Sequence, residues 1–162
     1  MNKNIMTFDE WAIMNKDEGM EKGHHASVEH MFQLLNKTFK EKYSVIDFGC
    51  GNGWVVRKFK KHSLCKMAHG LDGASAMIKK AMKADPNGMY FNEDINTWTP
   101  QQKYDIVFSM ETLYYFENPG NQLYIVEHFD MYQDALTAKK DRKIQDEYFI
   151  LYKDQNNEFC AR

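Results

Sequence analysis

The chain has 162 residues, of which 21 are Lys or Arg and 23 are Asp or Glu, giving a formal net charge of −2. This length is typical of one domain with its own core, and a composition of 43% hydrophobic and 27% charged residues excludes a disordered or collagen-like chain. The near-neutral charge gives no global attraction to nucleic acid, and no segment approaches the ~20 apolar residues that a membrane span requires.

The first regular pattern along the chain covers residues 26–40. Its apolar side chains recur at spacings of four, three and four residues and so share one helical stripe: Val28, Phe32, Leu35 and Phe39. The residues before this helix include Gly19 and Gly23, which suit a bendable flap. Residues 1–25 are therefore predicted to be a separate N-terminal segment, and 26–162 to form a single domain.

Strands and helices then alternate. Tyr43–Phe48 is apolar and β-prone and runs into a cluster of glycines, which predicts a short buried strand. By the same criteria we expect helices over 54–62 and 74–84, and strands over 67–71, 89–91 and 104–109. The segment Asp85–Gly88 combines Pro, Asn and Gly, so the second of these helices is expected to end there.

Further elements are predicted toward the C-terminus. A strand is expected over 123–126, after a Pro-Gly turn, and a last strand over 148–152. Met131, Ala135 and Ala138 lie at helical spacing between them and indicate a helix. Strands that alternate with helices form a parallel sheet through right-handed crossovers. The predicted class is a doubly wound, mainly parallel α/β sheet of about six strands with helices on both faces.

The most informative segment joins the first strand to the next helix and reads V-I-D-F-G-C-G-N-G-W over residues 45–54. Alternating glycines let the backbone pass close beneath a ligand, and the helix N-terminus offers free N–H groups to an anion. This pattern is typical of a loop that binds a nucleotide-type cofactor. The dinucleotide signature G-x-G-x-x-G needs glycine where Trp54 stands, which disfavours NAD even though Asp72 lies at a plausible distance for a ribose contact.

Four motifs follow one another between Trp11 and Tyr115. They are an acidic residue ahead of G-x-G-x-G, an acidic residue after each of the next two strands, and a strand of the form F/Y-D-x-V; they lie at 47–53, 71–77, 92–95 and 104–111. In this order they resemble the class I S-adenosylmethionine-dependent methyltransferases. The resemblance implies a Rossmann-like fold, S-adenosyl-L-methionine as the cofactor and methyl transfer as the activity.

The resemblance also implies which residues hold the cofactor. In that family the acid after the second strand binds the ribose hydroxyls, here Asp72, and the acid after the third strand receives the adenine amino group, here Asp94. The cofactor contacts expected within the domain are Asp47, Gly49, Cys50, Gly51, Asp72, Gly73, Asp94, Ile95 and Met110. Hydrogen-bond acceptors at strand ends complement a ligand that carries an ammonium group, two ribose hydroxyls and an adenine.

Methyltransferases of this type often fold an N-terminal segment over the cofactor, so residues 1–25 are interpreted as a lid. Trp11, Met20 and His24 are the expected lid contacts. The alternative is a surface loop whose Trp11 packs on the edge of the sheet.

Methyl transfer requires no particular catalytic residue, because the cofactor supplies the reactivity while the protein aligns the reactants and excludes water. If a base assists, the candidates are His24, His25 and His128; the alternative for each is a surface or packing histidine. The sequence after the fourth strand, residues 109–111, lacks the Asp/Asn-Pro-Pro-Tyr signature of methyltransferases that act on nucleic acid bases. A small-molecule acceptor is therefore expected. The lysine clusters on the predicted helices are interpreted as solvated faces rather than nucleic acid tracks.

The C-terminal third departs from the family pattern. A helix normally follows the fourth motif, but only residues 117–122 separate Phe116 from Leu123, and a crossover needs at least ~10–12 residues. We therefore expect a sheet that is shortened at its C-terminal end. This leaves open a catalytically silent S-adenosylmethionine-binding module, or one whose acceptor site is completed by a partner chain or a second copy. An NAD-linked oxidoreductase is the weaker alternative.

The N-terminal residues and the cysteines indicate the compartment of the protein and its metal content. The first twenty residues are polar and lack the apolar core of a signal peptide. Cys50, Cys65 and Cys160 form no C-x-x-C pair, which fits neither a disulfide framework nor a zinc site. A cytoplasmic protein without a bound metal is the expectation.

Overall fold

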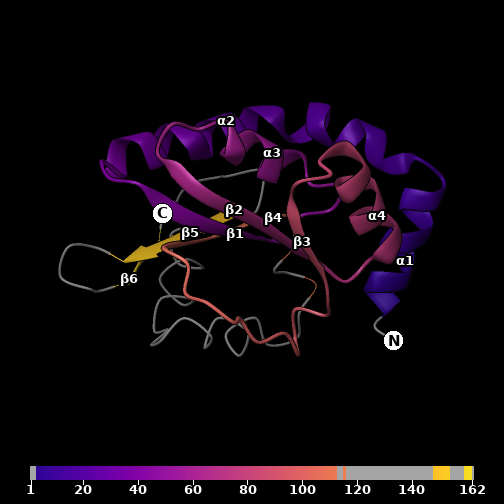
Figure 1. Cartoon of the computed structure of the whole chain (residues 1–162). Coiled ribbons are helices and arrows are strands. Elements are labelled where there is room, and N and C mark those ends of the chain that lie inside the picture. The colour runs from indigo at the N-terminus through magenta and orange to yellow at the C-terminus, as the bar shows by residue number, and fades with distance from the viewer. Residues whose placement is uncertain (1–2, 113–114, 116–147, 154–158, 162) are drawn as a thin grey trace.

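Six strands form one sheet in a computed structural model that describes residues 3–112, Tyr115, 148–153 and 159–161 (Figure 1). The strands are β1 (Tyr43–Phe48), β2 (Cys65–Asp72), β3 (Met89–Asn92), β4 (Ile106–Met110), β5 (Tyr148–Lys153) and β6 (Phe159–Ala161), in the spatial order β3-β2-β1-β4-β5-β6. The neighbours β3-β2, β2-β1 and β1-β4 are parallel, whereas β4-β5 and β5-β6 are antiparallel. The mainly parallel, Rossmann-like sheet predicted from the sequence is confirmed.

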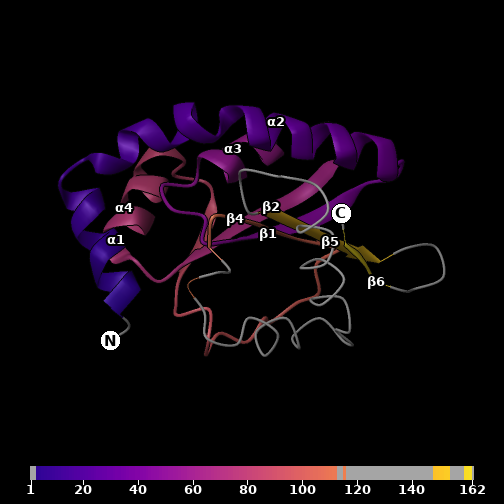
Figure 2. The ribbon, with the colours of Figure 1, turned by 180° about the vertical axis from the view of Figure 1, so that it is seen from behind.

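One face of this sheet is covered by helices. These are α2 (Met20–Thr38), α3 (Trp54–Lys60) and α4 (Ser75–Ala84), which lie on the same side of the strands in both views (Figures 1 and 2). Within the described residues the opposite face is covered by the turns of 93–105, which contain no helix. None of the described helices is both long and apolar enough to cross a membrane.

Strand β1 is buried on both faces, as its unbroken apolar pattern predicts. Tyr43 and Val45 contribute to the core beneath the helices. Ile46 and Phe48 point to the other face, where they join a second cluster that contains Leu71, Ile95, Trp98 and Val107. The central strand is thus fixed by two separate hydrophobic layers, and its C-terminal end is held in a defined position.

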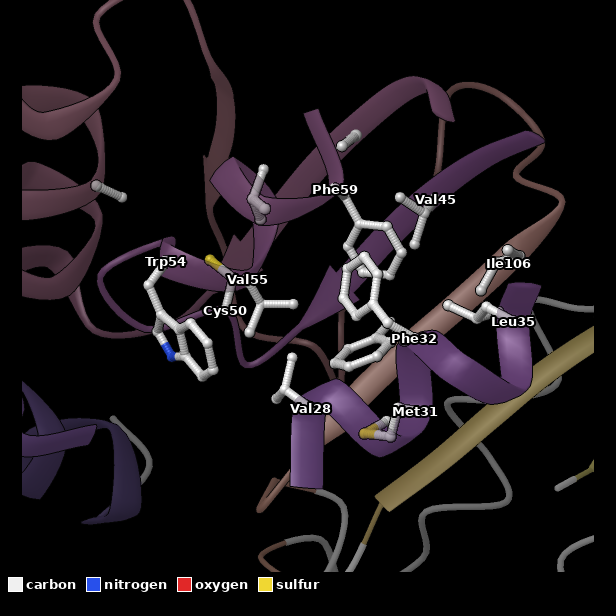
Figure 3. Packing of buried hydrophobic residues seen from close by; sticks show 14 of the residues in the cluster. Val28, Met31, Phe32, Leu35, Val45, Cys50, Trp54, Val55, Phe59 and Ile106 are labelled. Carbon is white, nitrogen blue, oxygen red and sulfur yellow. The ribbon is translucent and has the colours of Figure 1, made fainter. Parts of the chain in front are cut away.

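The helical face is held by aromatic packing (Figure 3). Phe59 of α3 is fully buried, and its ring centroid lies 4.5 Å from that of Phe32 in α2 and 5.2 Å from that of Phe108 in β4. Val28 and Leu35, from the stripe predicted over residues 26–40, are buried in the same cluster. The stripe is therefore confirmed as the inward face of α2.

Most helix and strand boundaries agree with the ranges predicted from the sequence. Strand β4 is an exception. The strand was expected from Tyr104 but begins at Ile106. The carboxylate of Asp105 instead accepts hydrogen bonds from the backbone N–H and hydroxyl of Ser44, both at 2.7 Å. Together with the hydrogen bond from the backbone N–H of Asp105 to the carbonyl of Ser44 at 3.1 Å, these contacts tie the residue before β4 to β1.

The N-terminal segment corrects the sequence analysis. It is helical, with α1 (Lys3–Ile13) and a 3-10 turn, η1 (Lys16–Gly19), ahead of α2, which begins at Met20 rather than at residue 26. Gly23 therefore lies within a helix, and the expectation of a bendable flap is wrong. The physical reason is an apolar face on α1, whose Phe8 and buried Ala12 pack against Ala74 and Met77 at the start of α4.

The structure describes only part of the C-terminal region for which the sequence predicts strands and a helix. The strand expected over 148–152 is confirmed as β5, and it pairs antiparallel with β4. The strand over 123–126 and the helix near Met131 lie outside the described residues. Shortening of the sheet at this end stays a prediction.

Replacing Phe59 by alanine is expected to lower the free energy of unfolding by about 3–5 kcal/mol, because it removes a fully buried ring and leaves a cavity. The measurement is urea unfolding followed by circular dichroism. Met82→Ala on α4 is the control; its side chain is 46% exposed, and its effect should stay within about 0.5 kcal/mol. Equal losses in the two variants would contradict the assigned core.

Candidate functional site

A cavity of about 310 Å³ opens where the carboxyl ends of β1, β2 and β4 meet. Parallel strands bring the loops that follow them to one edge of the sheet, and such edges are the usual ligand sites of doubly wound folds. The cavity brings together all the residues expected to contact a cofactor: Asp47, Gly49, Cys50, Gly51, Asp72, Gly73, Asp94, Ile95, Met110, Trp11, Met20 and His24.

The floor of the cavity is the glycine loop between β1 and α3. Gly49, Gly51 and Gly53 all have positive φ angles, of 72°, 52° and 75°. A Cβ atom at Gly49 would lie 2.0 Å from the hydroxyl oxygen of Thr112 after β4, so only glycine allows the two loops to approach. The alternating glycines thus bring bare backbone to the cavity, as the sequence predicted.

Asp72, at the end of β2, anchors this loop. One of its carboxylate oxygens accepts a hydrogen bond from the backbone N–H of Gly51 at 2.9 Å, and the other accepts one from Ala74 at 2.8 Å. Burial and the charge of nearby Asp9 raise its pKa, while the two backbone hydrogen bonds oppose that rise. Each carboxylate oxygen has two lone pairs, so both can still accept a hydrogen bond from a ligand.

Asp47, at the end of β1, is buried at the cavity with 4% of its surface exposed. Burial and the charge of Asp72 raise its pKa well above the usual range. Within the described part of the chain its carboxyl group has no hydrogen-bond donor. A buried carboxyl without a donor is costly, so this group points to a positively charged or hydrogen-bonding ligand.

Asp94 and Ile95 form the side of the cavity that follows β3. One oxygen of Asp94 accepts hydrogen bonds from the backbone and the side-chain amide of Asn96, at 2.9 and 2.7 Å. Ile95 is buried and packs in the same cluster as Trp98. These contacts fix a carboxylate next to an apolar side chain, which is the arrangement expected for an adenine ring.

Helix α1 forms a wall of the cavity. Asp9 accepts hydrogen bonds from the backbone N–H of Ala76 at 2.6 Å and from the hydroxyl of Ser75 at 3.2 Å, so it caps α4 from another helix. The ring of Phe8 packs edge-on against Trp11, with centroids 5.5 Å apart, and Trp11 lines the cavity. The alternative in which this tryptophan sits in a surface loop is excluded, because Trp11 lies within α1.

The sequence analysis missed several residues that line the cavity. On α1 they are Asn4, Ile5 and Phe8; in the loops and in α3 they are Trp54, Val55, Glu111 and Thr112. The spacing of Ile5, Phe8 and Ala12 is helical and was the available signal for α1. No sequence pattern marks Thr112, because its position follows from contact with Gly49.

The candidate bases have different surroundings. His24 lines the cavity. His25 does not line it and lies 3.7 Å from Glu29, one turn along α2, with 60% of its side chain exposed. His128 lies outside the described residues. His24 is therefore the candidate base that the structure brings to the cavity.

Three lysines of the basic clusters are paired within the chain. Lys58 contacts Glu29, Lys60 contacts Asp85 at 2.6 Å, and Lys80 contacts Asp17 at 2.5 Å. Such pairing reduces the positive charge that these helices present to a polyanion. In the part of the chain that the structure covers, no group of three potential ligand side chains could hold a metal ion.

The cavity and its fold agree with the comparison to known protein families. A family described as a methyltransferase domain matches residues 22–129. The chain belongs to this family. Its fold is the Rossmann-like fold of the class I S-adenosylmethionine-dependent methyltransferases.

The curated relatives are distant and longer. Malonyl-[acyl-carrier protein] O-methyltransferase 1 of Ilyobacter polytropus is 29% identical over 82 residues, which is 49% of this chain and 31% of the relative. Trans-aconitate 2-methyltransferase of Escherichia coli is 30% identical over 82 residues, covering 50% of this chain and 32% of the relative. The match thus spans about a third of the length of these two relatives.

Solved structures show the same fold. The complex between the Trm112 methyltransferase activator of Haloferax volcanii and a methyltransferase contains a chain that is 28% identical, with a TM-score of 0.63, and the match covers 74% of this chain and 53% of that one. A methyltransferase from Methanococcus maripaludis has a TM-score of 0.60 at 18% identity, covering 83% and 71%. At that identity the likeness concerns the fold.

Replacing Asp47 by asparagine is expected to raise the stability of the ligand-free methyltransferase domain relative to the unchanged chain, more at pH 8 than at pH 5. A carboxyl with a raised pKa stabilises the folded state fully below its unfolded pKa of ~4, and this contribution is lost as the pH rises through the folded pKa. The measurement is urea unfolding of both proteins at the two pH values. A difference that does not grow with pH would contradict the assigned burial of Asp47.

Proposed function

We propose that this chain binds S-adenosyl-L-methionine in the cavity and transfers its methyl group to a small-molecule acceptor. The observation that carries the proposal is the buried carboxyl of Asp47, which faces the cavity and lacks a donor within the described residues. The ammonium group of the cofactor would supply the missing charge and hydrogen-bond donors. The same contact would return Asp47 to its ionised form.

The remaining lining suits the rest of the cofactor. Asp72 has a free acceptor site on each oxygen for the ribose hydroxyls, and Asp94 with Ile95 would hold the adenine. Four carboxyl groups line the cavity, those of Asp47, Asp72, Asp94 and Glu111, and the described lining contains no Lys or Arg. This charge complements a cofactor that carries a positive sulfonium centre.

The chain's own residues would act by binding and orientation. When bound, the cofactor supplies a methyl group attached to a positively charged sulfur, and a nucleophile can attack the carbon of that methyl group. The glycine loop, Asp47 and Asp72 would fix the position of that group, while the aromatic wall of Phe8 and Trp11 would exclude water. Of the histidines considered as bases, His24 is the one that lines the cavity, and it could accept a proton from the molecule that receives the methyl group.

A small-molecule acceptor is supported by two observations. Residues 109–111, at the C-terminal end of β4, lack the signature of methyltransferases that act on nucleic acid bases. Of the two curated relatives described above, one is named for trans-aconitate, a small molecule, whereas the other is named for a malonyl group carried on a protein.

A partner-dependent binding module is the second candidate. A solved relative at 28% identity is described as a complex with a methyltransferase activator. If this chain works in the same way, a partner would complete its acceptor site and the isolated chain would bind cofactor without turnover. The family assignment gives no support to an NAD-linked oxidoreductase.

Isothermal titration calorimetry with S-adenosylmethionine, its demethylated product and NAD tests the proposal directly. Binding of the first two and not of NAD is expected. Binding of NAD alone would refute the proposed cofactor. Turnover on a panel of small molecules, with and without a candidate activator protein, then separates the enzyme from the partner-dependent module.

Replacing Asp72 by alanine is expected to weaken S-adenosylmethionine binding more than tenfold, about 1.4 kcal/mol or more, because two ribose hydrogen bonds and the anchor of Gly51 are lost. Calorimetry measures the affinity, and circular dichroism verifies the fold. Asp85→Asn is the control, since Asp85 pairs with Lys60 away from the cavity. Unchanged affinity in a folded Asp72→Ala variant would show that the ribose site is elsewhere.

A further inference from the structure

Asp17 is a charged side chain in an unusual place, because it belongs to the turn η1 between α1 and α2 and is only 2% exposed. One carboxylate oxygen accepts a hydrogen bond from the ammonium of Lys80 at 2.5 Å, and the other accepts one from the side-chain amide of Asn52 at 3.0 Å. Burial alone would raise its pKa, but the hydrogen bonds from Lys80 and Asn52 and the Lys80 charge hold that pKa below the usual value.

The two partners belong to different parts of the cavity framework. Asn52 stands between the second and third glycines of the loop, and its own side-chain oxygen accepts a hydrogen bond from the backbone N–H of Trp54 at 3.3 Å. Lys80 lies on α4 and also donates to the side chain of Asn15, at 2.8 Å. Asp17 therefore connects the corner between α1 and α2 to both the glycine loop and α4.

This corner lies between the two helical parts of the cavity wall. Trp11 precedes Asp17 on α1, and Met20 and His24 follow it on α2; all three line the cavity. The methyl group of Met20 lies over the loop, 3.7 Å from the position that a Cβ atom on Gly51 would take. A shift of the corner would move these side chains away from the cofactor site together.

We propose that Asp17 is a positioning residue that fixes the α1–α2 corner against the glycine loop, so that the N-terminal helices retain the bound cofactor. This proposal rests on the proposed function for its ligand, and on the contacts of Asp17, Lys80 and Asn52 for its mechanism. Asp17 does not line the cavity and touches no reacting atom. It acts through the side chains whose positions it fixes.

A purely stabilising role predicts a different result, and the chain offers a matched control. Asp85 pairs with Lys60 at 2.6 and 2.7 Å and caps the C-terminal end of α4, and neither residue lines the cavity. Asp17→Asn and Asp85→Asn each remove one carboxylate from an ion pair with a lysine. Only the first should change how the cofactor is held.

The test compares these two variants with the unchanged chain. Stopped-flow and calorimetric measurements with S-adenosylmethionine should show at least tenfold weaker binding and faster dissociation for Asp17→Asn, and less than a twofold change for Asp85→Asn. Limited trypsin digestion should cut after Lys22, an exposed residue of α2 whose adjacent residues are the same in all three proteins, several-fold faster in Asp17→Asn alone. Equal effects of the two variants, or an unchanged dissociation rate in folded Asp17→Asn, would overturn the proposal.

A second variant and a measurement without ligand cover the cases in which Asp17→Asn does not fold or the cofactor does not bind. If Asp17→Asn does not fold, Lys80→Gln replaces it, because glutamine removes the charge and shortens the reach of the donor to Asp17 by one bond. This variant should speed dissociation at least threefold, and no change would refute the proposal. If the unchanged chain fails to bind S-adenosylmethionine, the proposed function is wrong. The trypsin comparison still decides whether Asp17 fixes the corner, because it needs no ligand.

Discussion

The architecture of the site depends on the carboxylate of Asp72. Its two oxygens bind the backbone N–H groups of Gly51 and Ala74, so one side chain joins the loop after β1 to the segment that starts α4. Parallel pairing of β1 and β2 brings the two loops together, and the carboxylate fixes the distance between them. Each wall of the cavity is built outward from this junction.

Two hydrophobic layers hold the strands that carry this junction, whereas a smaller apolar cluster and several polar contacts hold the N-terminal wall. The aromatic cluster around Phe59 and the layer around Phe48 fix β1 from opposite faces. Helix α1 is attached through Asp9 and Asp17 and through the small contact surface around Ala12. The molecule thus combines a rigid cofactor floor with a wall that fewer apolar contacts secure, as is common for elements that must admit a ligand.

The central part of the fold and most of the cavity could be predicted from the sequence because their signals are local. A buried strand followed by alternating glycines, and acids directly after strands, specify their own positions once the strands pair in parallel. The docking of the N-terminal helix could not be predicted in this way, because Ile5 lies against Gly73 and Ala12 packs with Met77, each more than sixty residues away. Burial of Asp17 was equally hidden, since a lone aspartate is usually exposed and its partners, Asn52 and Lys80, are distant in sequence.

The cap that Asp9 provides for α4 couples two helices that lie far apart in the sequence. Helix α4 has no capping side chain of its own, since its N-cap residue is Ala74. Asp9 instead accepts hydrogen bonds from the hydroxyl of Ser75 and the backbone N–H of Ala76. Displacement of α1 would therefore leave the first turn of α4 uncapped, at a cost of about 0.5–2 kcal/mol, so α4 would fray at the end that borders the cavity.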